Sequence, residues 1–316
     1  FTEVLMSTPD VAQSLSMPVA RQPRFRQDKY APYFFISPFY ILFAIFFLFP
    51  TVFALVLGFF KWGALGTPSY FALRNYDHMF KDPLFLKAVG NTIFYGGVSL
   101  FVVVPLALLE ALALNSKRLK LKFLWRTLYF APIVTSSVAI SLVFRLLYNS
   151  DYGFINQFLL LLGGVPVKWM ESPNLTKVAV MGIVIWRWTG LLAIYFLAGL
   201  QSVPEELYEA AAIDGATGWQ RFVHITMPVL RPVTLFVSII VLIGSLQIFD
   251  DPQILYGGNT PGGPGNSAIS LVQYLYNQGI GQQLYGYASA VGVFLFAIIF
   301  ILSLVQLRVF SGFGGE

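Results

Sequence analysis

Residues 33–60 read YFFISPFYILFAIFFLFPTVFALVLGFF, a stretch of 28 residues without a charged side chain. A helix needs about 20 apolar residues to cross the roughly 30 Å hydrocarbon layer of a bilayer. Five further stretches have the length and composition of a crossing, or nearly so, namely 88–114, 127–147, 178–200, 232–249 and 287–307. The sequence therefore predicts an all-α membrane protein with six transmembrane helices.

The composition of the whole chain agrees with a bilayer as its solvent. Of the 316 residues, 57% are hydrophobic and 11% are charged, whereas a soluble domain carries roughly a quarter of charged residues. Aromatic residues make up 17% of the chain, and several lie beside the apolar stretches, as rings at headgroup level do. The chain has no Cys, and its two His, His78 and His224, lie in different loops, so we expect neither a disulfide nor a metal site.

The distribution of Lys and Arg predicts the orientation of the chain in the membrane. Of the 20 basic residues, twelve lie on the side of the N-terminus, six lie on the opposite side, and Arg145 and Arg187 fall inside expected spans. Because cytoplasmic loops carry the excess of positive charge, both termini are expected in the cytoplasm. The basic residues form no dense patch, so a nucleic-acid partner is not expected.

The segments outside the spans divide the chain into three parts. Residues 1–32 contain Pro, Gln, Ser and four cations, and we expect them to form a cytoplasmic N-terminal tail. The transmembrane domain is expected to cover residues 33–310. The remaining residues, 311–316, are expected to form a short C-terminal tail.

Two uncharged segments do not have the pattern of a span. Residues 154–167 are apolar but contain Gly163, Gly164 and Pro166, which predicts a surface or re-entrant segment. The segment 252–286 contains pairs of Gly, which predict turns and a flexible approach to the membrane. The P-loop pattern G-x-x-x-x-G-K-[ST] is absent from the sequence, so the chain is not expected to hydrolyse nucleotides.

The stretch between the fourth and fifth spans, residues 202–228, reads SVPEELYEAAAIDGATGWQRFVHITMP. Ser202 and Glu205 have the spacing of a capping box, and Pro204 suits a first helical turn, so a helix is expected to begin there. Gly215 can end this helix in a left-handed conformation. A second short helix, 219–226, is expected to end before Pro228.

The first of these helices has two different faces. Small and apolar residues recur at spacings of three and four and allow the close approach of a partner; they are Leu207, Ala210, Ala211 and Asp214. The other side concentrates the negative charge of Glu205, Glu206 and Glu209, which suits Arg or Lys on a docked protein. The alternative is a solvated connector between two spans.

Residues 209–228 resemble the EAA loop of ABC importer permeases, whose pattern is E-A-A, three residues, G, nine residues, I-x-L-P. The sequence departs from this pattern only at Met227, and it matches at Glu209-Ala210-Ala211, Gly215, Ile225 and Pro228. In that family the loop forms a coupling helix in a cleft of the ATPase subunit. The resemblance therefore implies the type I importer architecture and ATPase-coupling roles for Glu209, Ala210, Ala211, Asp214 and Gly215.

The resemblance covers nearly the entire chain and points to the carbohydrate branch of this family, which includes maltose and glycerol-phosphate importer permeases. The stretches that carry it are 75–76 (NY), 90–92 (GNT), 152–156 (YGFIN), 198–204 (AGLQSVP), 249–250 (FD) and 286–290 (GYASA). It implies a subunit that moves a sugar or sugar-like solute by alternating access across the cytoplasmic (inner) membrane of a prokaryote. A disaccharide, an oligosaccharide, a polyol and glycerol phosphate all remain open as the solute.

The resemblance also implies the partners of the chain. They are a second permease subunit, usually a different one, a dimer of ABC ATPases and an extracytoplasmic solute-binding protein. ATP and Mg are expected on the ATPase subunits, so no cofactor is expected on this chain, which would be a transport subunit and not an enzyme.

Polar residues inside the expected spans mark a route for the solute, because a polar group in hydrocarbon is costly unless it faces protein or water. Hydroxyl and amide groups hydrogen-bond sugar hydroxyls, and aromatic rings offer flat apolar faces to a sugar ring. The third and fifth spans also resemble the parts of the maltose relatives that contact sugar. The candidate residues are Thr135, Ser136, Ser137, Trp186, Trp188, Tyr195, Ser245, Gln247 and Asp250. The alternative is that these side chains only pack helices together.

Arg187 lies inside the fourth span, where exposure to lipid would cost about 2.5 to 3.5 kcal/mol. We therefore expect it either to bind an anionic solute or to pair with a carboxylate of the companion subunit.

Two other functions compete with that of an importer subunit. An ATP-independent channel or ion-coupled carrier would favour paired ionisable groups and internal repeats within the spans, and neither is evident in the sequence. A membrane-embedded enzyme would need clustered His or paired carboxylates, which the spans also lack.

Overall fold

The computed structural model describes residues 30–257 and 260–312. It divides into two units, of which the first ends at Val52 and the second begins at Phe53. The first unit contains helix α1 (Ala31–Phe43), the π-helical turn η2 (Ala44–Leu48) and the start of helix α2 (Phe49–Leu57). Residues 1–29 and 313–316, which make up most of the two expected tails, lie outside the described residues.

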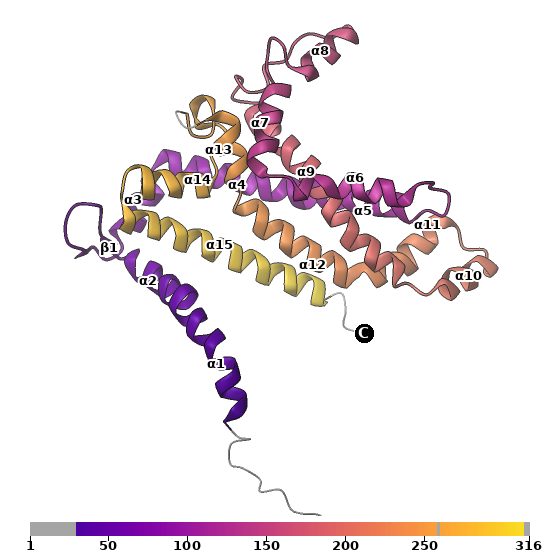
Figure 1. The fold of residues 1–316 in the computed structure, drawn as a ribbon, viewed down its shortest axis with the longest axis horizontal. Coiled ribbons are helices and arrows are strands. Elements are labelled where there is room, and N and C mark those ends of the chain that lie inside the picture. The colour runs from indigo at the N-terminus through magenta and orange to yellow at the C-terminus, as the bar shows by residue number, and fades with distance from the viewer. Residues whose placement is uncertain (1–29, 258–259, 313–316) are drawn as a thin grey trace, which may run out of the picture. The chain divides into compact units, whose positions relative to one another are not determined.

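The second unit is helical apart from one small hairpin (Figure 1). In the hairpin, strand β1 (Phe60–Lys61) pairs antiparallel with β2 (Ser69–Tyr70). The helices that follow are α3 (Arg74–Lys81), α4 (Pro83–Val98), α5 (Val104–Asn115), α6 (Lys122–Val134), α7 (Ser137–Leu147), α8 (Phe154–Leu161), α9 (Thr176–Gln201), α10 (Glu205–Ile213), α11 (Gly218–Arg221), α12 (Met227–Leu246), α13 (Asp250–Tyr256), α14 (Leu271–Tyr276) and α15 (Tyr285–Gly312). Shorter turns are the π-helical η3 (Ser99–Val103), η4 (Phe222–Thr226) and η6 (Asn277–Gly281) and the 3-10 turn η5 (Pro264–Asn266).

Within the described residues, five helical stretches are long and apolar enough to cross a membrane. They are Ala31–Leu57, Pro83–Asn115, Thr176–Gln201, Gly218–Tyr256 and Tyr285–Phe310. A sixth is complete only if the bent pair α6 and α7 counts as one span. The expected helical membrane architecture is therefore confirmed, and residues 154–167 contribute one short helix, α8, and no span.

The expected span over 127–147 is broken into two helices. Helices α6 and α7 meet at 99°, because Thr135 and Ser136 both leave the helical conformation, with ψ angles of 145° and 130°. Pro132 lies one turn before the break, and its missing N–H removes a helical hydrogen bond at that point. The chain therefore changes direction where two hydroxyl-bearing residues follow a proline.

Three π-helical turns accompany prolines in the span helices. The turns η2, η3 and η4 each end two residues before a proline, which is Pro50, Pro105 and Pro228 respectively. A proline ring clashes with the carbonyl four residues earlier in an α-helix, and in each case that carbonyl lies inside the widened turn, which relieves the clash. The prediction that a helix must end before Pro228 is therefore wrong, because the helix continues through η4 into α12.

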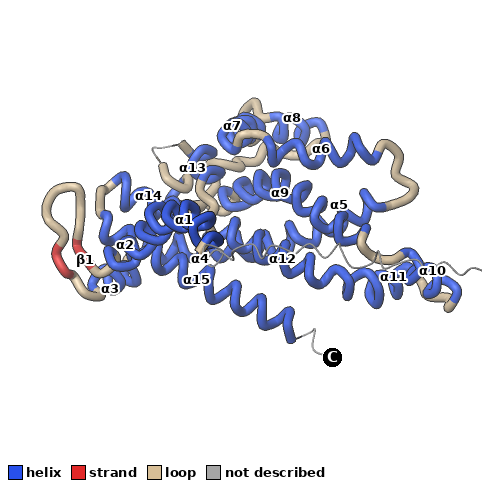
Figure 2. Tube along the Cα trace, turned by 60° about the horizontal axis from the view of Figure 1, so that its bottom comes forward, coloured by secondary structure: helices blue, strands red, loops and turns tan. Residues whose placement is uncertain are grey.

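Helix α9 lies at the centre of the second unit, where it packs against α5, α6 and α12 (Figure 2). Ile183, Leu192 and Phe196 on α9 are fully buried. The contact with α6 is close at Gly190, where a Cβ atom would collide with the carbonyl oxygen of Tyr129. This core holds α9 and α12 side by side, and these two helices carry four of the nine candidate route residues.

The glycine-rich segment after α13 is folded onto α4, so the expectation of a flexible approach fails for residues 260–286. Three side chains of α4 hold its backbone: Asn91 donates to the carbonyl of Ile269, Tyr95 donates to that of Ala268, and the Thr92 hydroxyl accepts from the N–H of Leu271, all at 2.7 to 2.9 Å. The expected turns do occur, since several of its glycines have positive φ. The polar groups of α4 thus fix a segment that has no charge of its own.

The predicted orientation can be tested with tags at both ends of the chain and within residues 115–126. All three are expected to react with a membrane-impermeant reagent only after the cytoplasmic side is opened, because the basic residues favour that side. Labelling of the loop around Glu209 from outside intact cells would contradict this orientation.

Candidate functional site

Helix α10 and the turn after it form the exposed loop that carries the EAA pattern, at the end of the second unit opposite α3 and β1 (Figures 1 and 2). Gly215 has a φ of 76°, as predicted. The N–H of Ala216 bonds to the carbonyl of Ala211 at 2.8 Å, and that of Gly215 bonds to Ala212 at 3.2 Å. This pair of bonds is a Schellman motif, which satisfies the last carbonyls of the helix.

The start of α10 differs from the prediction. Ser202 does not cap it, because its hydroxyl donates to the carbonyl of Gly199 at the end of α9 instead, at 2.8 Å. Pro204 occupies the N-cap position without a side-chain hydrogen bond. A capping box does form in this loop, but it lies after α10, between Thr217 and Gln220 at the start of α11.

Two contacts tie α10 to the membrane helices of its own chain. Lys117, just after α5, donates a hydrogen bond to Glu205. The Glu205 carboxylate raises the pKa of Lys117, Glu209 acts in the same direction, and Lys117 in turn lowers the pKa of Glu205. The pair is exposed and contributes little to stability. The second contact joins the hydroxyls of Tyr208 and Thr226, 2.8 Å apart, and Thr226 belongs to the π-helical turn that begins the α12 stretch.

Two hollows flank α10. One, of about 520 Å³, is lined by residues that include Lys117, Glu205 and Glu209. The other, of about 350 Å³, is lined by residues that include Ala211, Asp214 and Gly215. Arg221 lines both hollows. Glu209 thus lines one hollow, and Ala211, Asp214 and Gly215 line the other, and these concave surfaces can receive side chains of another protein.

A second candidate site is a cavity of about 360 Å³ between α9, α12 and α13. Four of the candidate route residues line it: Trp188, Ser245, Gln247 and Asp250. Ser137 adjoins it, because its hydroxyl donates to the Asp250 carboxylate at 2.8 Å. The cavity thus brings together a flat ring, a hydroxyl, an amide and a carboxylate from segments far apart in the sequence.

The other four candidates lie elsewhere. Thr135 and Ser136 form the break between α6 and α7, and the Thr135 hydroxyl donates to the carbonyl of Ala131. Trp186 lies against Phe144, with ring centres 5.5 Å apart, and Tyr195 lies against Phe236 at the same separation. None of these four lines the cavity, and their role in the solute route stays a prediction.

Arg187 has its partner within its own chain. Its guanidinium lies 3.0 Å from the carboxylate of Asp251 on α13, and the two side chains are 12% and 1% exposed. The Ser141 hydroxyl of α7 donates to the same carboxylate at 3.3 Å. Arg187 was expected to bind an anionic solute or a carboxylate of a companion subunit. The structure instead pairs it with a carboxylate of its own chain, in the cavity wall.

Asp251 and Ser141 are absent from the candidates that the sequence provides. A signal for Asp251 exists, because a cation inside a span calls for an acidic partner, and Asp251 adjoins the candidate Asp250. No pattern distinguishes Ser141 from the other hydroxyl residues of the same apolar stretch, since its partner lies 110 residues away in the sequence.

Comparison with known proteins places this geometry in a family. The family described as "Binding-protein-dependent transport system inner membrane component" matches residues 1–312. The arabinooligosaccharides transport system permease protein AraP of Bacillus subtilis (strain 168) is 38% identical over 293 residues, which is 92% of each chain. The lactose transport system permease protein LacF of Rhizobium radiobacter is 35% identical, over 86% of this chain and 91% of its own.

A solved structure has the same fold. It is the crystal structure of a bacterial ABC transporter involved in the import of the acidic polysaccharide alginate, which matches 90% of this chain and 96% of its own with a TM-score of 0.80 at 24% identity. The expected type I importer architecture is thereby confirmed. The chain belongs to the family of inner membrane components of binding-protein-dependent transport systems.

Proposed function

We propose that the chain is the permease subunit of an ABC importer and moves an oligosaccharide or a related sugar-like solute by alternating access. The observation that carries this proposal is the cavity lined by Trp188, Ser245 and Gln247. Its volume of about 360 Å³ falls in the range of small-molecule sites, and its mixture of apolar walls and a few polar groups is typical of them. Relatives named for arabinooligosaccharides and lactose support the sugar class.

The drive for transport is proposed to come from partner subunits. An ABC ATPase dimer would hold ATP and Mg and would dock on α10 through Glu209, Ala210, Ala211, Asp214 and Gly215. Tyr208 joins this helix to the turn at the base of α12, and the other end of α12 lines the cavity with Ser245. A movement of the docked ATPase would therefore reach the cavity through one continuous helix, and this chain would need no catalytic residues.

Two further partners complete the proposal. A second permease subunit would supply the other wall of the route, and an extracytoplasmic solute-binding protein would deliver the cargo. The direct test is to purify the assembled complex from its native membrane and to identify the bound solute by mass spectrometry. A sugar is expected, and bound amino acids or metal chelates in place of sugar would contradict the solute class.

Trp188 and Trp186 provide a matched pair for testing the route. Trp188→Ala is expected to raise the solute concentration for half-maximal stimulation of ATP hydrolysis about fivefold, because a ring contact contributes ~1 kcal/mol. Trp186→Ala removes a ring of the same size that packs on Phe144 outside the cavity, and it should change this value little where the route runs through the cavity alone. Ser137→Ala and Gln247→Ala are expected to shift it in the direction of Trp188→Ala. A shift of equal size for the two Trp variants would place Trp186 on the route as well, and no shift for either would argue that both rings serve packing alone.

A further inference from the structure

Helix α7 does not continue in the direction of α6, since the two meet at 99°. Helix α6 has 13 residues, which at 1.5 Å per residue gives about 20 Å, less than the roughly 30 Å hydrocarbon layer. If α6 runs along the bilayer normal, the 99° angle places α7 closer to the membrane plane than to the normal. Figure 1 shows α7 leaving the other helices of the second unit, with α8 beyond its far end.

The outward face of α7 is apolar except at Arg145, which is exposed three residues after Leu142. Val138, Leu142 and Leu146 recur at spacings of four and are all exposed, so they share one side of the helix. The buried residues Ile140 and Ser141 lie on the other side, which packs against α13. One face of α7 therefore belongs to the cavity wall, and the opposite face has no cover within the described residues of the second unit.

Helix α8 continues this exposed apolar surface. Phe154, Phe158 and Leu161 follow one another at spacings of four and three, and Leu161 is 84% exposed. Leu162 and Val165 extend the surface beyond the helix and are also exposed. Residues 152–167 contain no charged side chain, so the surface lacks the charged rim that a docking site for a soluble protein normally has.

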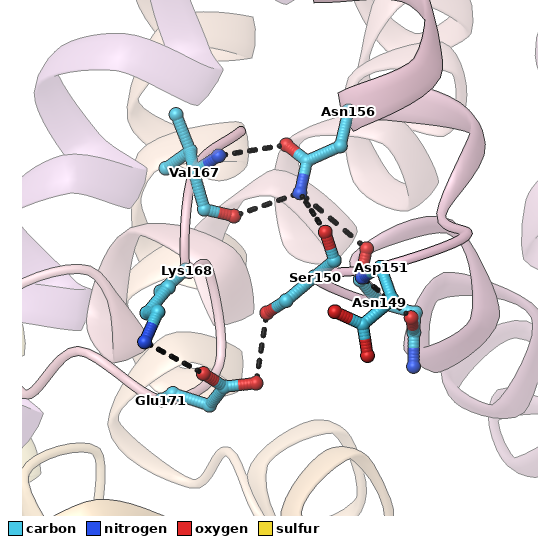
Figure 3. Close-up of polar contacts among 7 residues, drawn as sticks. All are labelled: Asn149, Ser150, Asp151, Asn156, Val167, Lys168 and Glu171. Atoms are coloured by element: carbon cyan, nitrogen blue, oxygen red, sulfur yellow. Dashed lines mark hydrogen bonds and ion pairs between the residues drawn. The ribbon is translucent and has the colours of Figure 1, made fainter. Parts of the chain in front are cut away.

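Asn156, which is 1% exposed, binds backbone groups of this segment from the inside (Figure 3). Its amide nitrogen donates to the carbonyls of Ser150 and Val167 at 3.1 and 2.9 Å. Its oxygen accepts from the N–H of Val167 and the indole N–H of Trp169, both at 3.0 Å. One side chain thereby joins the two arms of the segment and satisfies backbone groups that would be costly to bring into an apolar environment.

The charged groups gather at the base of the segment. Lys168 lies 3.9 Å from Glu171, and the Ser150 hydroxyl donates to the same carboxylate at 2.8 Å. Figure 3 shows these side chains below the Asn156 hydrogen bonds. The segment thus has an apolar tip and a charged base, as an element at the boundary between lipid and water has.

We propose that α8 and the exposed face of α7 lie in the bilayer, at the interface on the side opposite α10. The occupant of this surface is lipid, because residues 152–167 carry no charged side chain and continue from a helix of the membrane domain. The role of α8 is to anchor α7. Since Ser137 and Ser141 of α7 hydrogen-bond Asp250 and Asp251, an anchored α7 gives the cavity a wall that is fixed in the membrane while α12 moves.

The test uses single cysteines at Phe158 and Leu161, because the chain has no Cys of its own. Each is labelled with bimane in the complete complex, which is reconstituted in vesicles of phosphatidylcholine and phosphatidylglycerol. Doxyl-labelled phosphatidylcholine is expected to remove most of the fluorescence at both positions, whereas iodide in the water removes little. Solute-stimulated ATP hydrolysis checks that each labelled complex is assembled, and Val165→Cys reports on the same face if one of the two does not assemble.

Lys168→Cys at the charged base is the matched control, and we expect iodide to quench it and doxyl lipid to leave it bright. Quenching of positions 158 and 161 by iodide would place α8 in water and overturn the proposal. Protection of both positions from both quenchers would place a protein partner on this face, and it would overturn the lipid assignment equally.

Discussion

A complex that carries Glu209→Lys is expected to lose most of its ATPase subunits during purification while its membrane helices stay inserted. Glu209 is exposed on α10 and lines the hollow beside it, so a docked protein meets its charge directly. Placing like charges opposite each other at an interface costs several kcal/mol, and a loss of about 2 kcal/mol already weakens binding roughly thirtyfold. The measurement is the amount of ATPase retained per permease, together with solute-stimulated hydrolysis in liposomes.

Gly215→Val tests the same site through the backbone. A Cβ at Gly215 meets no atom within 4 Å, so the substitution introduces no clash, but a φ of 76° costs an L-residue roughly 1–2 kcal/mol. The Schellman turn is expected to rearrange and to misplace the end of α10. Gly218→Val is the control, because Gly218 also has open space around it and has no positive φ. If Glu209→Lys and Gly215→Val both keep the ATPase and normal stimulation, α10 is only a connector.

The coupling loop could be predicted from the sequence because its determinants are local. Gly215 ends a helix through its own backbone freedom, and a fixed spacing from Glu209 to Pro228 carries the family pattern. The errors at this site are local too. The hydroxyl of Ser202 had two backbone partners within reach and bonds to the carbonyl of Gly199, and the ring of Pro228 was tolerated because a π-helical turn widens the helix before it.

Removing one member of the buried ion pair is expected to have the largest effect on folding. Arg187→Met leaves Asp251, whose side chain is 1% exposed, as an uncompensated charge, and Asp251→Leu does the same to Arg187. Breaking a buried pair in this way typically costs about 3–5 kcal/mol. Each single variant should therefore lower the yield of folded complex and its thermal midpoint in detergent.

The double variant Arg187→Met/Asp251→Leu is expected to recover most of the lost stability, because replacing both charges by apolar groups of similar size is often neutral. Asp250→Asn is the control for Asp251→Leu, and it should lower stability much less. Asp250 is exposed and accepts a hydrogen bond from Ser137. A double variant as unstable as the two single variants combined would show that Arg187 and Asp251 do not act as a pair.

The cavity was only partly predictable, because its walls come from segments far apart in the chain. The chemistry of hydroxyl, amide and ring groups pointed to Trp188, Ser245 and Gln247, all of which line it. The same chemistry could not exclude Trp186, since two residues along a helix change the facing direction by about 200° and the sequence does not say which face meets the cavity. The partner of Arg187 likewise depends on a contact between distant residues, and such contacts leave no local pattern.

The π-helical turn η4 sets the rotational phase between the two ends of one long helix. Its hydrogen bonds join residues five apart, whereas those of an α-helix join residues four apart, so the turn holds one extra residue. Deleting a single residue from it would restore α-helical spacing and turn α12 by about 100° relative to α11. Gly244 and Ser245 would then leave the cavity wall although neither had been substituted, so the length of this turn is itself a determinant of what the cavity presents to a solute.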